Sequence, residues 1–257
     1  MIHPSAQVHP EAKLDPSVEV GPWCVVGQHV KIGKNTKLMS HVVIDGWTEI
    51  GENNLVFPFA VLGAVPQDLK YKGEVVYLKI GNHNTIREGV TINLGTTQGG
   101  GSTTVGDHNL IMSYVHMGHD CHVRNHCVLA THTGLSGHVT VEDYAILGGM
   151  VGVVQFARVG IHAYIGGQAG ITKDVPPFTI VEGMRPPVIR GVNIVGLRRR
   201  GYDAETITRI NETVKLWVRP EVPKEQCILE IESQYGEIPE VQQFIRFIRE
   251  SKPGVIK

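Results

Sequence analysis

Six of the 13 histidines of this chain lie in one short stretch, between residues 116 and 138. One of them, His119, is followed directly by a carboxylate, Asp120. An imidazole gains and loses its proton near neutral pH, so a histidine beside a carboxylate is a common general base. A nearby backbone N–H that stabilised an oxyanion would complete the chemistry of acyl transfer. Whether these groups meet depends on the elements that position them.

Apolar side chains recur at every sixth position along most of the chain. Three uninterrupted runs, over residues 8–62, 80–92 and 105–171, contain 25 such positions, and glycine follows 11 of them. A period of six fits neither an α-helix nor one half-buried strand, but it fits a short strand followed by a tight turn. Three such units close a triangular coil of 18 residues, in which glycines and small residues are expected to turn the corners. The pattern predicts an all-β parallel β-helix of hexapeptide repeats, with about eight coils and a length of roughly 40 Å.

The length of the coil determines which residues of different coils become neighbours. Residues 18 apart stack in one column, about 5 Å from one another along the axis. His119 is therefore predicted to lie beside Gly137, whose N–H could donate to an oxyanion, while Asp120 could orient the imidazole. Residues six apart point to different faces, so His126, His132 and His138 cannot form one metal site within a chain. The predicted strip consists of His119, Gly137 and Gln155, with Asp120, His138 and Phe156 beside them.

Two insertions and a charged segment interrupt or end the repeat. The insertions cover residues 64–79 and 94–104, and loops that leave a solenoid commonly build its binding face. The glycine run in the second insertion, residues 99–101, lacks the Lys-Ser/Thr of a phosphate-binding loop. Residues 191–257 hold 21 of the 49 charged residues, and helices are predicted over 203–218, 224–235 and 240–251. These patterns predict a β-helix domain over residues 1–190 and a helical domain over 191–257.

Five arginines gather near this predicted boundary: Arg185, Arg190, Arg198, Arg199 and Arg200. Such a cluster is either the solvated edge of a helix or a landing site for a diphosphate or an acidic carrier protein. Charge alone leaves both interpretations open.

The overall composition excludes several classes of protein. The formal net charge of −1 argues against a nucleic-acid-binding protein, and 42% hydrophobic residues argue against a disordered chain. No segment has the features of a signal peptide or a membrane span. Four cysteines are few for this length and favour a reducing, cytoplasmic location. Cys121 and Cys127 occupy positions of small interior residues, which indicates packing and not a nucleophilic role.

Several longer motifs resemble those of the UDP-N-acetylglucosamine O-acyltransferase family, which catalyses the first step of lipid A biosynthesis. The resemblance covers essentially the whole chain, and its most specific parts are the loop Gln67–Glu74 and the segment His116–Cys121. Further matching segments are Ile2–Ala6, Thr97–Gly101, Gly137–Val139, Gly148–Met150, Asp174–Pro177, Gly191–Asn193 and Arg199–Gly201.

The resemblance implies a left-handed β-helix that forms a homotrimer with active sites between subunits. The implied reaction transfers an (R)-3-hydroxyacyl group from acyl carrier protein to the 3-hydroxyl of UDP-N-acetylglucosamine, with no metal or other cofactor. By matching motif, His119 would be the general base, Asp120 its orienting partner and the Gly137 amide the oxyanion donor. Gly167 would lie at the floor of the acyl groove and limit the chain length. The resemblance also implies substrate contacts for Gln67, Asp68, Lys70, His116, His138, Gln155, Asn193, Arg199 and Arg200.

Two residues depart from the pattern of that family. Val154 stands where many members have histidine, and Val195 stands where a glutamate is common. The second change leaves the acceptor sugar open, since some relatives acylate a 3-amino analogue and form an amide. Three other interpretations stay open as well: a zinc enzyme of the γ-type carbonic anhydrase class, an acyltransferase that uses coenzyme A, and a non-catalytic trimeric scaffold.

Overall fold

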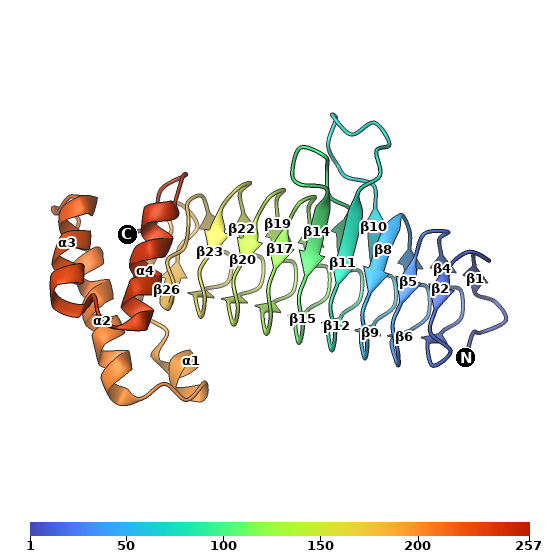
Figure 1. The fold of residues 1–257 in the computed structure, drawn as a ribbon, viewed down its shortest axis with the longest axis horizontal. Coiled ribbons are helices and arrows are strands. Elements are labelled where there is room, and N and C mark those ends of the chain that lie inside the picture. The colour runs from blue at the N-terminus through green and yellow to red at the C-terminus, as the bar shows by residue number, and fades with distance from the viewer.

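The computed structural model of the protein describes all residues from Met1 to Lys257. An elongated prism of three sheets makes up most of the molecule, and helices cover its C-terminal end (Figure 1). Each coil adds one short strand to each sheet, so strands three apart in the sequence are neighbours in space. The fold is a left-handed parallel β-helix with a small helical C-terminal region, which confirms the predicted fold class.

The strands are only two to five residues long, because the chain turns a corner after each of them. The nine-stranded sheet contains β1 (Gln7–Val8), β4 (Val25–Val26), β7 (Val43–Ile44), β10 (Val61–Ala64), β13 (Thr91–Asn93), β16 (His116–Met117), β19 (Gly134–Leu135), β22 (Gly152–Val153) and β25 (Gly170–Ile171). The eight-stranded sheet contains β2 (Lys13–Leu14), β5 (Lys31–Ile32), β8 (Trp47–Ile50), β11 (Tyr77–Ile80), β14 (Ser102–Val105), β17 (His122–Val123), β20 (Thr140–Val141) and β23 (Arg158–Val159). The ten-stranded sheet contains β3 (Glu19–Val20), β6 (Lys37–Leu38), β9 (Leu55–Val56), β12 (Thr85–Ile86), β15 (Leu110–Ile111), β18 (Val128–Leu129), β21 (Ile146–Leu147), β24 (Tyr164–Ile165), β26 (Thr179–Glu182) and β27 (Val188–Val192). All neighbours are parallel except β26 and β27, which pair antiparallel at the C-terminal end.

The repeating apolar residues form a continuous core along the axis of the prism. Every one of them from Val20 to Ile171 is buried, whereas Val8 and Leu14 are half-buried, because no further coil packs on their outer side. One cluster of 44 buried residues runs through the prism. Burying one such side chain stabilises the fold by roughly 1.5–3 kcal/mol, so the regular spacing of these residues accounts for the straight stack of coils.

The glycines that follow the repeating residues have a different role from the one that the sequence suggested. Among these 11 glycines only Gly63 has a left-handed φ, of +82°. The others allow close approach of the next coil: at Gly21, a Cβ would lie 2.7 Å from the Met39 carbonyl oxygen. The left-handed corners are formed instead by 18 non-glycine residues, many of them His, Tyr, Phe or Asn. The prediction that glycines turn the corners was therefore wrong for most of these positions.

The corners lie along three edges of the prism, which we name by one residue each. The His119 edge joins the nine-stranded to the eight-stranded sheet, and the His126 edge joins the eight-stranded to the ten-stranded sheet. The Gly167 edge joins the ten-stranded to the nine-stranded sheet. His138 lies on the first edge and His132 on the third, so the prediction that His126, His132 and His138 occupy different faces is confirmed.

Aromatic rings form a ladder along the His126 edge. The rings of His83, His108, His126, Tyr144 and His162 stack in successive coils, with centroids 4.7 to 4.9 Å apart and nearly parallel planes. At the C-terminal end of this series, His162 is buried and its Nε2 lies 3.3 Å from the hydroxyl of Tyr202 in the helical C-terminal region. Burial lowers the pKa of His162 to about 4, and the positive charge of Arg200 acts in the same direction. The folded protein therefore keeps this imidazole neutral.

We expect this ladder to make the protein less stable on acidification. Below about pH 6.5 the His162 side chain becomes protonated in the unfolded chain but not in the folded one, so protons favour unfolding. The free energy of unfolding begins to fall at that pH and levels off near pH 4, and the part that His162 contributes to this fall is about 3 kcal/mol. His162→Phe should remove this part of the pH dependence when urea unfolding is measured from pH 7 to pH 4. An unchanged dependence would assign the effect to other groups.

Both insertions leave the prism on the same side (Figure 1). The first joins β10 to β11, and the second joins β13 to β14. Each therefore starts in the nine-stranded sheet and returns in the eight-stranded sheet. Because that is the definition of the His119 edge, both insertions lie on the edge that carries the predicted general base.

Four helices form the cap: α1 (Ile194–Arg199), α2 (Ala204–Trp217), α3 (Lys224–Tyr235) and α4 (Pro239–Glu250). The three longer helices confirm the predicted ones, and Asp203 caps α2 by accepting the N–H of Thr206 at 2.8 Å. Helix α1 was not predicted, because six residues are too few to show a helical period. The predicted boundary at residues 190/191 falls inside β27, which is hydrogen-bonded to β26 of the prism. None of the helices combines the length and the apolar character that crossing a membrane requires.

Candidate active site

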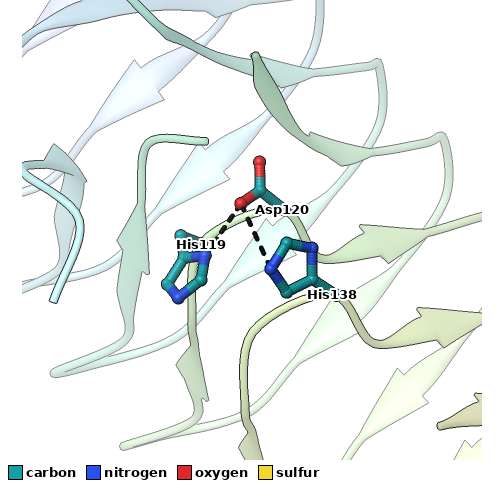
Figure 2. A group of neighbouring side chains, drawn as sticks. All are labelled: His119, Asp120 and His138. Atoms are coloured by element: carbon teal, nitrogen blue, oxygen red, sulfur yellow. Dashed lines mark hydrogen bonds and ion pairs between the residues drawn. The ribbon is translucent and has the colours of Figure 1, made fainter. Parts of the chain in front are cut away.

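His119 and Asp120 form a buried pair in the turn between β16 and β17. The Nδ1 atom of His119 donates to Oδ2 of Asp120 at 2.8 Å (Figure 2). The two residues are 6% and 1% exposed, so little water competes for this hydrogen bond. Because Nδ1 is bound to the carboxylate, Nε2 is the ring nitrogen that is left to accept a proton. The geometry suits a general base whose tautomer is held by an acid.

The second insertion holds the carboxylate of Asp120 in place. Backbone N–H of Thr96 donates to Oδ1 at 2.7 Å, and the Thr96 hydroxyl donates to Oδ2 at 2.6 Å. The N–H of Asp120 itself donates to the Thr103 hydroxyl at 2.8 Å. Sequence reasoning missed both threonines, because they lie outside the repeating positions and no column arithmetic connects Thr96 to Asp120.

Gly137 lies one coil further along the axis and packs against the His119 ring. A Cβ at this position would lie 2.6 Å from Cε1 and 2.7 Å from Nε2 of His119, so only glycine leaves the ring where it is. The N–H of Gly137 donates to no other group of the chain. The predicted column is therefore present, with a free backbone donor beside the free nitrogen of the imidazole.

His138 approaches the same carboxylate from the next coil. Its Nε2 lies 3.8 Å from Oδ2 of Asp120, and its ring meets the His119 ring edge-on at a centroid distance of 5.0 Å (Figure 2). The His138 ring also stacks on the Phe156 ring, with the two ring centroids 4.4 Å apart. Burial lowers the pKa of His138, while the negative charge of Asp120 opposes that shift. A largely neutral imidazole at this place can donate a hydrogen bond to a substrate or accept one from it.

A groove of about 520 Å³ runs along the nine-stranded sheet from this pair toward the cap. Three glycines in register, Gly134, Gly152 and Gly170, form its floor, and a Cβ at either of the first two would meet no atom within 4 Å. His116 lies at one end, where its Nδ1 is hydrogen-bonded to the Thr91 hydroxyl at 2.8 Å. The polar residues that line the groove are Gln67, His116, His119, Ser136, Gln155, Thr172 and Arg185.

The remaining predicted residues of the first insertion, Asp68 and Lys70, do not line this groove. Asp68 and Lys70 share a tight turn, in which Lys70 N–H donates to Oδ1 of Asp68 at 2.9 Å. Lys70 is exposed. The negative charge of Asp68 opposes the lowering of the His138 pKa by burial. Val154, one of the two residues that depart from the family pattern, lines the groove and is 38% exposed. The His119 edge thus gathers most of the predicted substrate contacts.

Four predicted residues lie on the other two edges of the same chain. Gly167 is exposed in the turn between β24 and β25, on the Gly167 edge. Arg200 stacks on the Tyr144 ring of the His126 edge at 4.6 Å, and Arg199 is exposed beside it at the end of α1. Asn193 caps α1 through the N–H of Gly196 and donates to the carbonyl of His162. One chain alone therefore does not bring these residues to His119.

The arginines also fall into separate places. Arg185 lines the groove, and Arg190 pairs with Glu182 at 3.5 Å on the antiparallel strand pair. Arg198 and Arg199 end helix α1. The cluster that the sequence suggested is thus divided among the groove, the antiparallel strand pair and the His126 edge.

The cysteines have the environment of packing residues. Burial raises the pKa of Cys121 to about 12 and that of Cys127 to about 12. The Sγ atom of Cys121 donates to the carbonyl of Ser136 at 3.0 Å. A thiol that keeps its proton is a poor nucleophile, so neither residue is suited to form a covalent intermediate.

His119, Asp120 and His138 also have the types and spacing of metal ligands, with one donor atom each within 4.8 Å of the others. Both oxygens of Asp120, however, already accept hydrogen bonds from Thr96, and Oδ2 accepts a further one from His119. Because Nδ1 of His119 is directed at the carboxylate, the pair is arranged for proton transfer more than for coordination.

Comparisons with known proteins identify similar sequences and structures. A family model described as Udp N-acetylglucosamine O-acyltransferase, Domain 2, matches residues 174–256. The chain is 41% identical to a Francisella novicida UDP-N-acetylglucosamine acyltransferase, with a TM-score of 0.97, over 100% of this chain and 94% of that one. It is 40% identical to such an enzyme from Bacteroides fragilis, with a TM-score of 0.97 and 100% of both chains covered. A Moraxella catarrhalis UDP-N-acetylglucosamine O-acyltransferase is 39% identical, with a TM-score of 0.95 over 100% and 99% of the two chains.

Proposed function

Since the chain belongs to the UDP-N-acetylglucosamine O-acyltransferase family, we propose that it catalyses the first step of lipid A biosynthesis. In this reaction an (R)-3-hydroxyacyl group passes from the thioester of acyl carrier protein to the 3-hydroxyl of UDP-N-acetylglucosamine. The observation that carries the proposal is the His119–Asp120 pair, whose 2.8 Å hydrogen bond leaves Nε2 free beside the unoccupied N–H of Gly137. Base and oxyanion donor are the two groups that direct acyl transfer requires.

The positions of these groups support the following mechanism. Nε2 of His119 takes the proton of the 3-hydroxyl as the oxygen attacks the thioester carbonyl carbon. The carbonyl oxygen becomes an oxyanion and accepts the N–H of Gly137, while Asp120 stabilises the imidazolium. Collapse of the tetrahedral intermediate breaks the C–S bond, and the departing thiolate takes the proton from His119. No acyl-enzyme forms, because neither buried cysteine is an activated nucleophile.

The positions of the predicted substrate-binding residues around this centre support their proposed roles. His116, Gln155 and Gln67 line the groove beside the His119 pair, and His138 lies next to Asp120. Asp68 acts on His138 through its charge, and Lys70 shares a turn with Asp68 in the first insertion. Asn193, Arg199, Arg200 and Gly167 lie on other edges, so they can serve the reaction only through neighbouring copies. We propose a homotrimer in which a second chain completes each site, as closed symmetry would allow. A monomer in light scattering at micromolar concentration would contradict it.

A second candidate acceptor is the 3-amino analogue of UDP-N-acetylglucosamine, which would yield an amide. Val195 is the observation that favours this acceptor. It is 59% exposed on α1 and offers no carboxylate where a glutamate is common. One assay tests both acceptors, by crossing each sugar with hydroxyacyl carrier proteins of different chain lengths. Ester formation on UDP-N-acetylglucosamine is the expected result. Faster transfer to the amine would establish the alternative, and no transfer to either sugar would refute the proposal.

Gly167 is expected to set the acyl-chain length. It is exposed and has no side chain, so it leaves room for an acyl chain of about 12 to 14 carbons. Each buried methylene of that chain should strengthen binding by roughly 0.8 kcal/mol. A methionine side chain would fill this space, and Gly167→Met should shift the preferred donor to shorter chains in the same assay. An unchanged donor profile would remove Gly167 from the account.

A further inference from the structure

The second insertion folds back onto the catalytic pair. After β13 it forms a tight turn in which the carbonyl of Thr96 accepts the N–H groups of Gly99 and Gly101, at 3.1 and 2.7 Å. Thr96 itself is 2% exposed, although it belongs to a loop. The turn is therefore built around this threonine, and the threonine is directed inward.

Thr96 binds both oxygens of the Asp120 carboxylate. Its backbone N–H donates to Oδ1 at 2.7 Å and its hydroxyl to Oδ2 at 2.6 Å, and the Asp120 side chain is fully buried. The hydroxyl must be the donor, because an ionised carboxylate can only accept. Its oxygen in turn accepts the N–H of Gly99 at 3.1 Å, which fixes the direction of the hydroxyl. A chain of hydrogen bonds thus runs from Gly99 through Thr96 to the oxygen that binds His119.

Gly99 closes the loop over the same carboxylate. A Cβ at this position would lie 2.0 Å from Cγ of Asp120, well inside the closest approach of real side chains. The loop backbone therefore covers the carboxylate directly, and Asp120 has only one position that satisfies Thr96 and His119 together.

We propose that Thr96 is a positioning residue for the acyl transfer, which acts through Asp120 on the orientation of His119. The inference rests on the proposed function, since it assigns a role in that reaction. Thr96 touches neither substrate nor the reacting atoms. It fixes the rotation of the carboxylate, and the carboxylate fixes the imidazole so that Nε2 faces the acceptor hydroxyl.

The experiment compares two substitutions at Thr96 in the acyl-transfer assay. Thr96→Val removes the hydroxyl and keeps the shape, and it should lower kcat by about 10- to 100-fold, the effect of one lost hydrogen bond to a charged group. The KM values for both substrates should change little, because the residue acts only through the base. Thr96→Ser restores the hydroxyl and should recover most of kcat. Gly99→Ala is a second, independent variant, which should lower kcat by displacing the carboxylate.

A matched control separates positioning from stability. Thr36 is also fully buried, and its hydroxyl donates to the carbonyl of Gly51 at 2.9 Å in the N-terminal coils, far along the chain from Asp120. Thr36→Val should lower the unfolding temperature without lowering kcat. A double variant gives the sharper test. In an Asp120→Asn background, Thr96→Val should lower kcat only a few-fold further, because the carboxylate through which Thr96 acts is already changed.

Three results would overturn the inference while leaving the proposed function intact. They are a normal kcat in both Thr96→Val and Gly99→Ala, an equal loss in Thr96→Ser, and a full additional loss in the Asp120→Asn background. Failure of the unmodified protein to acylate either sugar would instead refute the proposed function itself. If Thr96→Val does not fold, a normal kcat in Gly99→Ala would by itself overturn the inference, and a lowered kcat would support it.

Discussion

Replacement of His119 by alanine should lower kcat by roughly 10²–10⁴-fold, the range for loss of a general base. The acceptor hydroxyl would then have to lose its proton to water, while the oxyanion donor stays in place. The KM values should change little, since the loss is felt mainly in the transition state.

A histidine three positions away provides the control for this variant. His122 lies on β17, in the eight-stranded sheet, and its Nδ1 is hydrogen-bonded to the Thr104 hydroxyl at 2.9 Å. His122→Ala should keep kcat within a few-fold of the unmodified enzyme. A near-normal kcat in His119→Ala would refute the assignment of the base. A trapped acyl adduct on Cys121, sought by mass spectrometry, would refute the direct mechanism.

Gly137→Ala should have the second largest effect, a loss of about 10²–10³-fold in kcat, comparable with removal of an oxyanion donor. The added Cβ would lie 2.6 Å from the His119 ring, so the ring must move away from both the carboxylate and the acceptor. The φ of Gly137 lies outside the left-handed region, so alanine adds no backbone strain of its own. The loss would therefore report the position of the imidazole, as measured by kcat in the acyl-transfer assay and by thermal unfolding.

Gly134 offers the matched substitution for Gly137. It lies three residues earlier, and a Cβ there meets no atom within 4 Å. Gly134→Ala should disturb the fit of the acyl chain in the groove more than the chemical step, and so change kcat far less. Equal losses in the two variants would show that the groove, and not the contact with His119, limits the rate.

The sequence alone determined the architecture and which residues become neighbours at the centre of the candidate site. A six-residue period is a local property, and every coil repeats the last, so columns follow from counting 18 residues. That arithmetic placed Gly137 beside His119, and the Cβ distance of 2.6 Å to the ring agrees with it. The pairing of His119 with Asp120 was also within reach, because the two residues are adjacent in the chain.

Only the tertiary structure decided how the loops and the corners are used. Thr96 lies in an insertion without any period, so its contact with Asp120 depends on how the loop folds back and on no spacing rule. The corners were assigned to glycine from composition, whereas stacking with the neighbouring coils lets His, Tyr and Phe offset the cost of a left-handed φ. The 18-residue count already separates Gly167 from His119, which lie 48 residues apart, whereas the contact of Arg200 with Tyr144 on the His126 edge depends on how the C-terminal region folds back. Spacing sets the order of residues along one edge, whereas in the proposed trimer the packing of whole chains would decide which edges face each other, because that packing depends on surfaces and on no repeat within the chain.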